Sequence, residues 1–180
     1  LPLAKLVICN VPHPRAMSDA FNWEQLKKSW YVLFFQIPWL PEKLFGRNEA
    51  SAIGRMMRDT ASDKGMFPEE VGEVYRRNAA TPGALSAMIN YYRGLLRPGK
   101  GGQRVDPWAL IDTPTLMVWG EDDVALSKST TLTTHKYVSD FTIRYLAGVS
   151  HWVQQEQPDA VNDMMSAFLT DQPVPEYTPN

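Results

Sequence analysis

The chain has 180 residues, of which 44% are hydrophobic and 21% charged, with 18 basic and 20 acidic side chains. This composition is typical of a globular domain, and the net charge of −2 excludes the strongly basic surface that nucleic acids and anionic membranes attract. A single cysteine excludes an intrachain disulfide, and no apolar run approaches the ~20 residues that a membrane span needs.

The first predicted element is a strand at residues 3–11, which read LAKLVICNV between two prolines. An almost continuous apolar run of this length is typical of a strand buried on both faces of a parallel sheet. Cys9 lies inside this run, and we interpret its thiol as a small buried hydrophobe. The chain enters the strand without a signal-peptide pattern, as if further strands of the same sheet preceded residue 1.

Residues 15–97 are predicted to form helices joined by irregular segments. Residues 21–35 are rich in aromatic side chains, residues 49–60 carry a weak helical stripe, and a further helix opens at residues 67–70. Thr81 is a candidate N-cap for the last helix of this block. The apolar face of that helix comprises Leu85, Met88, Ile89 and Tyr92. A polar, glycine-rich linker at residues 99–106 follows.

Two more buried strands are predicted at residues 115–119 and 141–146, with a helix between them at residues 127–138. An amphipathic helix at residues 158–169 follows, because its apolar side chains recur at the i, i+3, i+4 and i+7 spacing. Those side chains are Val161, Met164, Met165, Phe168 and Leu169. Residues 171–180 contain three prolines, and we expect them to form a loose tail.

This order of elements predicts an α/β fold, in which a mostly parallel sheet is interrupted by an all-helical insertion. The expected division places a core strand in residues 1–14, the helical insertion in 15–104, the rest of the core in 105–170 and the tail in 171–180. Three strands alone would leave the sheet with unpaired edges, so the pattern also favours core strands that lie before residue 1.

Polar side chains follow the second and third predicted strands. Gly120-Glu121-Asp122-Asp123 follows one strand, and Gly148-Val149-Ser150-His151 follows the other. Because sites in α/β sheets lie at the carboxyl ends of strands, an acid and a histidine there indicate two members of a nucleophile–acid–histidine triad. The alternative is structural: the aspartate serves a turn, and the histidine caps a helix.

Four motifs resemble those of the α/β-hydrolase-fold epoxide hydrolases. The segments WGEDD at residues 119–123 and SHWVQQEQP at residues 150–158 are similar to the acid motif and the histidine motif of this family. The first helix of the lid is similar to SWYVLFFQIPWLPE at residues 29–42, and the end of the lid to NYYR at residues 90–93. The resemblance extends from residue 3 to about residue 169. It implies the C-terminal portion of an α/β-hydrolase fold with an inserted helical lid, whose N-terminal core strands are absent from the chain.

The resemblance also implies roles for individual residues. The family's motif spacing selects Asp123 over Asp122 as the acid that orients His151, the general base. Tyr31 and Tyr92 would donate hydrogen bonds to the epoxide oxygen, with Tyr91 as the neighbouring alternative; the helical stripe favours Tyr92. An apolar substrate pocket would be lined by Phe34, Phe35, Trp39, Leu40 and Trp152, although each of these side chains is also common in a plain core.

In this family an aspartate in a G-x-D-x-G turn attacks the epoxide, and an HGxP loop binds the oxyanion; neither motif occurs in the chain. The resemblance therefore implies an enzyme that turns a hydrophobic epoxide into a vicinal diol through an aspartyl ester, and a chain that is inactive without the missing N-terminal part. No cofactor is implied. The three histidines are widely spaced, so we expect no metal site, a structural role for His13 and a surface position for His135. We also expect no phosphate loop from the glycines at 99–102, because no helix start follows them.

Two other functions stay open at this level. A haloalkane or haloacetate dehalogenase shares the acid and histidine motifs, but it needs halide donors rather than a pair of lid tyrosines. A non-catalytic, ligand-binding relative would also lack the nucleophile. A serine upstream of residue 1 would instead indicate an esterase.

Overall fold

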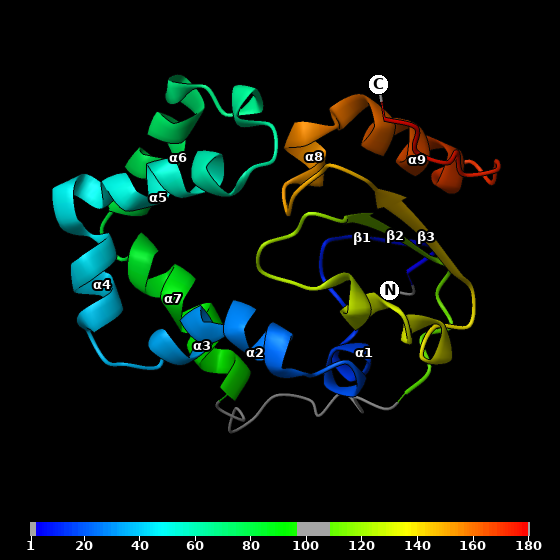
Figure 1. The fold of residues 1–180 in the computed structure, drawn as a ribbon, viewed down its shortest axis with the longest axis horizontal. Helices are drawn as coiled ribbons and strands as arrows, with labels where there is room; N and C mark the ends of the chain where they lie inside the picture. The colour runs from blue at the N-terminus through cyan, green and yellow to red at the C-terminus, as the bar shows by residue number, and fades with distance from the viewer. Residues whose placement is uncertain (1–2, 97–108, 180) are drawn as a thin grey trace. The chain divides into compact units, whose positions relative to one another are not determined.

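The computed structural model describes residues 3–96 and 109–179, so the predicted linker at 99–106 lies outside the described residues. The chain divides into two compact units, a sheet unit (residues 1–28 and 105–180) and a helical unit (residues 29–104), each described here by itself (Figure 1). The first boundary differs from the prediction, which began the helical insertion at residue 15. Residues 15–28 belong to the sheet unit because they bond to it, as when the Gln25 side chain donates to the Ala125 carbonyl.

The sheet unit is built on three parallel strands in chain order, β1 (Leu6–Cys9), β2 (Thr115–Gly120) and β3 (Phe141–Leu146). The predicted parallel α/β layer is therefore confirmed. Cys9 lies opposite Val118, and Gly120 lies opposite Leu146. Because the strands are parallel and in register, the loops that follow them emerge at one edge of the sheet.

Helices α8 (Val153–Glu156) and α9 (Pro158–Leu169) lie along one face of this sheet, as Figure 1 shows. The bounds of α9 are those that its apolar periodicity predicts. Apolar side chains from the sheet, the turn after β3 and both helices form the core of the unit. They are Leu116, Val118, Leu146, Val149, Val153, Val161, Met164 and Phe168. Two short helices, α1 (Pro14–Asp19) and α2 (Trp23–Lys28), follow β1.

The helix predicted at residues 127–138 is wrong. The segment instead forms two short 3₁₀ turns, η2 (Lys128–Thr131) and η3 (Thr134–Lys136). Threonine hydroxyls bond back to the backbone here: Thr130 donates to the Ser127 carbonyl at 2.7 Å, and Thr131 donates to that of Lys128 at 2.8 Å. Such local bonds, together with β-branched side chains, favour short turns over a continuous helix.

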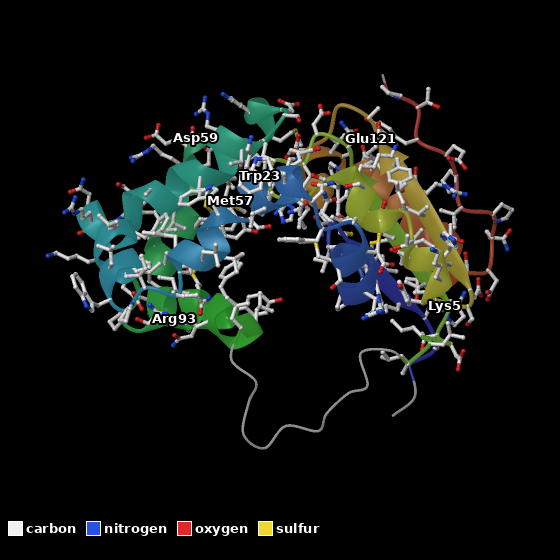
Figure 2. The ribbon with its side chains drawn as sticks, turned by 60° about the horizontal axis from the view of Figure 1, so that its bottom comes forward. Lys5, Trp23, Met57, Asp59, Arg93 and Glu121 are labelled. Atoms are coloured by element: carbon white, nitrogen blue, oxygen red, sulfur yellow. The ribbon has the colours of Figure 1, made fainter. Side chains whose placement is uncertain are left out.

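The prediction of a loose C-terminal tail is also wrong. Arg144 on β3 donates to the carbonyl oxygens of Val174 at 2.7 Å and Pro175 at 2.9 Å, and Val174 and Tyr177 pack against the core of the unit. Lys5, labelled in Figure 2, donates to the last carbonyls of α9 and pairs with Asp171 at 2.7 Å. The residues that bind the tail are distant from it in sequence. A prediction from the tail's own proline content therefore could not include them.

The helical unit contains α3 (Trp30–Phe34), α4 (Leu40–Phe45), α5 (Arg47–Thr60), η1 (Lys64–Met66), α6 (Glu69–Ala80) and α7 (Ala84–Leu96). Helices α5 and α6 cross where Gly54 meets Gly72; a Cβ on either glycine would lie 2.8 Å from the carbonyl oxygen of the other. Thr81 does not cap α7 as predicted, because its hydroxyl bonds back to the Arg77 carbonyl of α6. No helix among the described residues has the length and apolar character needed to cross a membrane.

Candidate active site

The loops after β2 and β3 are in close backbone contact. The amide of Asp122 donates to the Val149 carbonyl at 2.9 Å, and the amide of Glu121 donates to that of Leu146 at 3.1 Å. A Cβ at Gly120 would lie 2.0 Å from the Ser150 carbonyl oxygen, far inside van der Waals contact. Only glycine allows the two loops to approach this closely. The glycine of the WGEDD motif thus brings together the acid loop after β2 (residues 121–127) and the histidine turn after β3 (residues 147–152).

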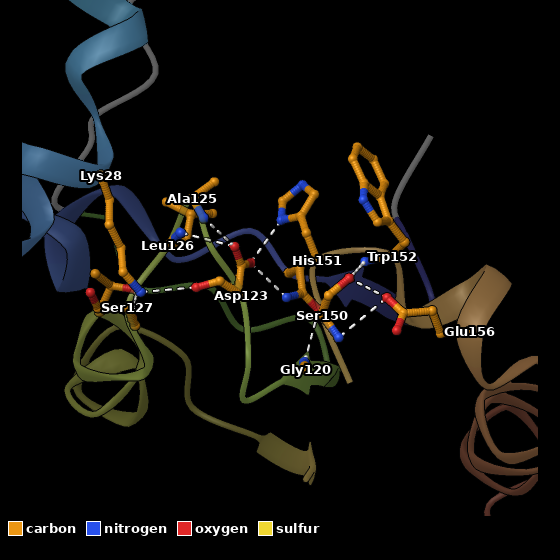
Figure 3. Close-up of polar contacts among 12 residues, drawn as sticks. Lys28, Gly120, Asp123, Ala125, Leu126, Ser127, Ser150, His151, Trp152 and Glu156 are labelled. Atoms are coloured by element: carbon orange, nitrogen blue, oxygen red, sulfur yellow. Dashed lines mark hydrogen bonds and ion pairs between the residues drawn. The ribbon is translucent and has the colours of Figure 1, made fainter. Parts of the chain in front are cut away.

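The acid and the histidine predicted from the sequence lie within hydrogen-bonding distance. The Nδ1 atom of His151 is 2.7 Å from the Oδ2 atom of Asp123 (Figure 3). The Asp123 side chain has no exposed surface, whereas that of His151 retains 27% exposure. The buried acid therefore fixes one edge of the imidazole ring, and the ring keeps access to its surroundings.

The Asp123 carboxylate is surrounded by donors. Asn10 Nδ2 donates to Oδ2 at 2.7 Å. The amides of Ala125 and Leu126 donate to Oδ1 at 2.7 and 2.9 Å (Figure 3). Burial raises the pKa of this carboxyl, but the hydrogen bonds from His151, Asn10 and Ala125, together with the charge of His151, outweigh burial and hold the pKa below its usual 3.8. An ionised carboxylate only accepts hydrogen bonds. The proton of a neutral His151 ring thus lies on Nδ1, which leaves Nε2 free to act as a base.

Asn10 is a site residue that the sequence analysis missed. Its side chain is fully buried, and besides donating to Asp123 it accepts from the amide of Gly120 at 3.0 Å. Its φ of 46° lies in the left-handed region, which asparagine tolerates better than most residues. The signal that was available in the sequence is an asparagine directly after the apolar residues of a predicted strand.

A second buried carboxylate holds the turn that carries the histidine. Glu156 of α8 accepts from the hydroxyl of Ser150 and, at 3.3 Å, from its amide. Trp152 places its ring edge-on to that of His151, with centroids 4.9 Å apart. The hollow beside this turn has a volume of about 340 Å³ and is lined by Cys9, His151, Trp152, Gln154 and Gln155. Cys9 is half-buried, and burial raises the pKa of its thiol.

In the helical unit, the structure brings the two predicted tyrosines together. The rings of Tyr31 on α3 and Tyr92 on α7 meet edge to face with centroids 5.5 Å apart, and Phe35 contacts both. Tyr91 is 68% exposed, whereas Tyr92 is half-buried. Burial, and to a smaller extent the neighbouring Tyr91, raises the pKa of Tyr92, so its phenol stays protonated and able to donate.

Four of the five predicted pocket residues lie in the helical unit and the fifth lies in the sheet unit. Phe34 and Phe35 pack with each other and with Phe45 in the aromatic cluster of the helical unit. Trp39 is 65% exposed and has a φ of 53°, and the half-buried Leu40 begins α4 directly after it. Trp152 belongs to the sheet unit, where it contacts His151.

Arg93 is a second residue whose importance the sequence analysis missed. Its guanidinium contacts both carboxylate oxygens of Glu42, at 2.5 and 3.1 Å, and donates to the carbonyls of Phe35 at 2.9 Å and Ile37 at 2.8 Å. Figure 2 labels Arg93 on α7. These bonds fasten α7 to the segment between α3 and α4, and so hold Tyr92 next to Tyr31. Arg93 stands in the NYYR motif, which was the available signal.

The remaining histidines have structural roles or are exposed. His13 accepts from the amide of Arg15 at 3.2 Å at the start of α1, and its ring stacks on that of Tyr137 at 5.0 Å. His135 is exposed in η3. Within residues 3–96 and 109–179, no three His, Cys, Asp or Glu side chains lie together as a metal site would require.

Comparisons with known proteins identify the family of the chain. The model of a family described as "Alpha/beta hydrolase family" matches residues 4–164. Epoxide hydrolase 4 of Homo sapiens is 34% identical over 177 residues, and epoxide hydrolase 2 of Caenorhabditis elegans is 31% identical over 172 residues. Each match covers 93% of this chain but 47% and 48% of those proteins, so the chain spans about half of their length.

A solved structure shows the same relation. The crystal structure of an epoxide hydrolase from Bacillus megaterium, in complex with an inhibitor, superposes with a TM-score of 0.78 at 25% sequence identity. The superposition covers 93% of this chain and 61% of the bacterial one. The shared part includes strands, strand-end loops and helices, in keeping with part of a larger fold.

Proposed function

Because this chain belongs to the alpha/beta hydrolase family, we propose that it supplies the acid, the base and the lid of an epoxide hydrolase. The substrate class is a small hydrophobic epoxide, and the product is the vicinal diol. The epoxide hydrolases among its relatives support this choice. The observation that carries it is the contact between Tyr31 and Tyr92, two phenols from separate helices whose rings meet at 5.5 Å.

The phenols account for the first chemical step. When a nucleophile opens an epoxide, negative charge develops on the ring oxygen, and donors held in a dry site stabilise that charge as it forms. Tyr31 and Tyr92 are the donors in this proposal. The aromatic contacts of Phe35 with both rings limit the freedom of their side chains. The nucleophile is a carboxylate outside these 180 residues, so the chain alone is expected to give no turnover.

The acid–base pair accounts for the second step. The carboxylate attack leaves a hydroxyalkyl ester, whose C–O bond breaks when water adds to the ester carbonyl. His151 Nε2 takes a proton from that water, and Asp123 stabilises the imidazolium that results. The imidazolium returns this proton to the departing alkoxide, so the diol leaves and His151 is neutral again. The water oxygen remains on the enzyme carboxyl group, which releases its own proton. No cofactor enters either step.

Replacing each tyrosine by phenylalanine in the full-length protein tests the proposal, with an aryl epoxide as substrate and diol formation as readout. We expect Tyr31→Phe and Tyr92→Phe each to lower kcat/KM by about 10²-fold, as the loss of one oxyanion donor does. The exposed Tyr91→Phe is the matched control and should retain full activity. Unchanged turnover in both Tyr31→Phe and Tyr92→Phe would contradict the proposal. Turnover of a haloalkane instead would favour a dehalogenase, and binding without turnover a ligand-binding relative.

A further inference from the structure

The loop that carries Asp123 has little regular structure, so its backbone groups need partners from elsewhere. The carboxylate of Asp123 itself binds the amides of Ala125 and Leu126. Two further backbone groups are bound by Gln25 of α2. Gln25 Nε2 donates to the Ala125 carbonyl at 3.0 Å, and Gln25 Oε1 accepts from the Ser127 amide at 2.8 Å. Both ends of one side-chain amide are thus used on this loop.

Two neighbours of Gln25 on α2 add to this contact. Lys28 Nζ donates to the carbonyl of Asp123 at 2.9 Å, as Figure 3 shows, and Glu24 accepts from the Ser127 hydroxyl at 3.0 Å. The backbone amide of Gln25 in turn donates to the side-chain Oδ1 atom of Asn22 at 2.9 Å. A helix of six residues therefore binds the acid loop at both residue 123 and residue 127.

Gln25 has no exposed surface. Burying a side-chain amide costs free energy unless its donors and acceptors are paired, and an apolar side chain of similar size would fill the same space without that cost. The two bonds to the acid loop are what a glutamine provides and a leucine does not. Packing alone thus does not account for this residue.

We propose that α2 is a clamp for the acid loop, with Gln25 as a positioning residue that sets Asp123, and through it His151, for catalysis. The inference rests on the proposed function only where activity is the readout. Gln25 acts through the backbone at residues 125 and 127. Lys28 is also the last residue of the sheet unit before the chain continues into the helical unit.

The test compares Gln25→Leu with Gln25→Glu in the full-length protein. Leucine keeps the volume and leaves the Ala125 carbonyl and Ser127 amide unpaired, whereas glutamate still accepts from Ser127. Lys5→Met is the matched control, because it removes bonds at the end of α9 within the same unit and leaves the acid loop untouched. Circular dichroism and urea unfolding identify the conditions in which every variant is folded.

The first readout is the downfield proton resonance of His151 Nδ1–H, which reports its hydrogen bond to Asp123 without any substrate. We expect this resonance to shift and broaden in Gln25→Leu, to change less in Gln25→Glu, and to stay in place in Lys5→Met. The second readout is epoxide turnover, for which we expect kcat to fall about 10²-fold in Gln25→Leu with KM within about threefold of the parent value.

These readouts separate the two proposals. A parent protein that hydrolyses no epoxide but shows the expected change in the His151 resonance would overturn the proposed function and support the clamp. A folded Gln25→Leu variant with an unchanged resonance would overturn the clamp. If Gln25→Leu does not fold, the comparison of Gln25→Glu with Lys5→Met decides: equal resonances in the two variants would refute the clamp.

Discussion

The approach of Gly120 to the histidine turn is the tightest steric constraint at the candidate site. A Cβ at this position would lie 2.0 Å from the Ser150 carbonyl oxygen and 2.5 Å from that of Val149. Ordinary van der Waals contact begins at 3.4 Å. In Gly120→Ala the Ser150 carbonyl oxygen must therefore move away from the new Cβ by about 1.4 Å, the difference between 2.0 and 3.4 Å. Both opposing atoms are backbone, so no side-chain rotation relieves the clash.

This displacement reaches the catalytic pair. His151 directly follows Ser150, and its 2.7 Å bond to Asp123 is lost if the turn moves while the acid stays. We expect turnover of an epoxide to fall by at least about 10²-fold, the cost of misplacing a catalytic group by ~1 Å. We also expect the free energy of unfolding to fall by about 1–3 kcal/mol, which is typical of overpacking.

Urea unfolding and epoxide turnover in the full-length protein measure these two effects. Gly94→Ala is the control for stability, because it lies in α7 and its added Cβ would meet no atom within 4 Å. Alanine there should raise the free energy of unfolding by about 0.5–1 kcal/mol. Parental stability and turnover in Gly120→Ala would refute the steric argument, since the turn would then adjust without affecting the site.

Two further predictions concern charged groups. Arg93→Met should lower the free energy of unfolding in urea by roughly 2 kcal/mol, which is less than for a fully buried pair because Arg93 and Glu42 keep 13% and 22% exposure. Arg93→Lys should not restore this stability, because lysine cannot bind both carboxylate oxygens and two carbonyls. Full stability in Arg93→Lys would contradict the role of the hydrogen-bond network. Because the pKa of Asp123 is lowered from 3.8 in the folded protein, its contribution to stability is complete above about pH 4 and is lost as the pH falls through the lowered value. Unfolding measured between pH 7 and 3 should therefore show a steeper loss in the parent than in Asp123→Asn; equal slopes would disprove the assignment.

The elements that depend on local pattern were predictable from the sequence. The strands stand out because apolar runs end at proline or glycine, although β2 is buried whereas β1 and most of β3 are half-buried. Helix α9 stands out because its apolar residues repeat with the helical period. Local reasoning failed at residues 127–138, where threonine hydroxyls compete for backbone carbonyls, and at the tail, which Arg144 binds from a distant strand. Tertiary contacts of this kind leave no periodic trace in the sequence.

The same division applies to the candidate site. Asp123, His151, Tyr31 and Tyr92 stand in motifs that resemble a known family, so the sequence pointed to them. Their supports, Asn10 and Gln25 among them, are ordinary residue types at positions 113 and 100 residues away from their main partners. Only the fold brings such residues together. Supports of this kind are therefore found from hydrogen bonds and burial rather than from motifs.

The two halves of the proposed chemistry are each organised within one unit of the chain. In the sheet unit, a buried carboxylate that accepts from Asn10 and from the amides of Ala125 and Leu126 fixes the base His151. In the helical unit, Arg93 and a set of aromatic contacts fix the phenols. Preorganisation of this kind reduces the cost of reorganisation during reaction, because donors that already point at their targets need not move when charge develops.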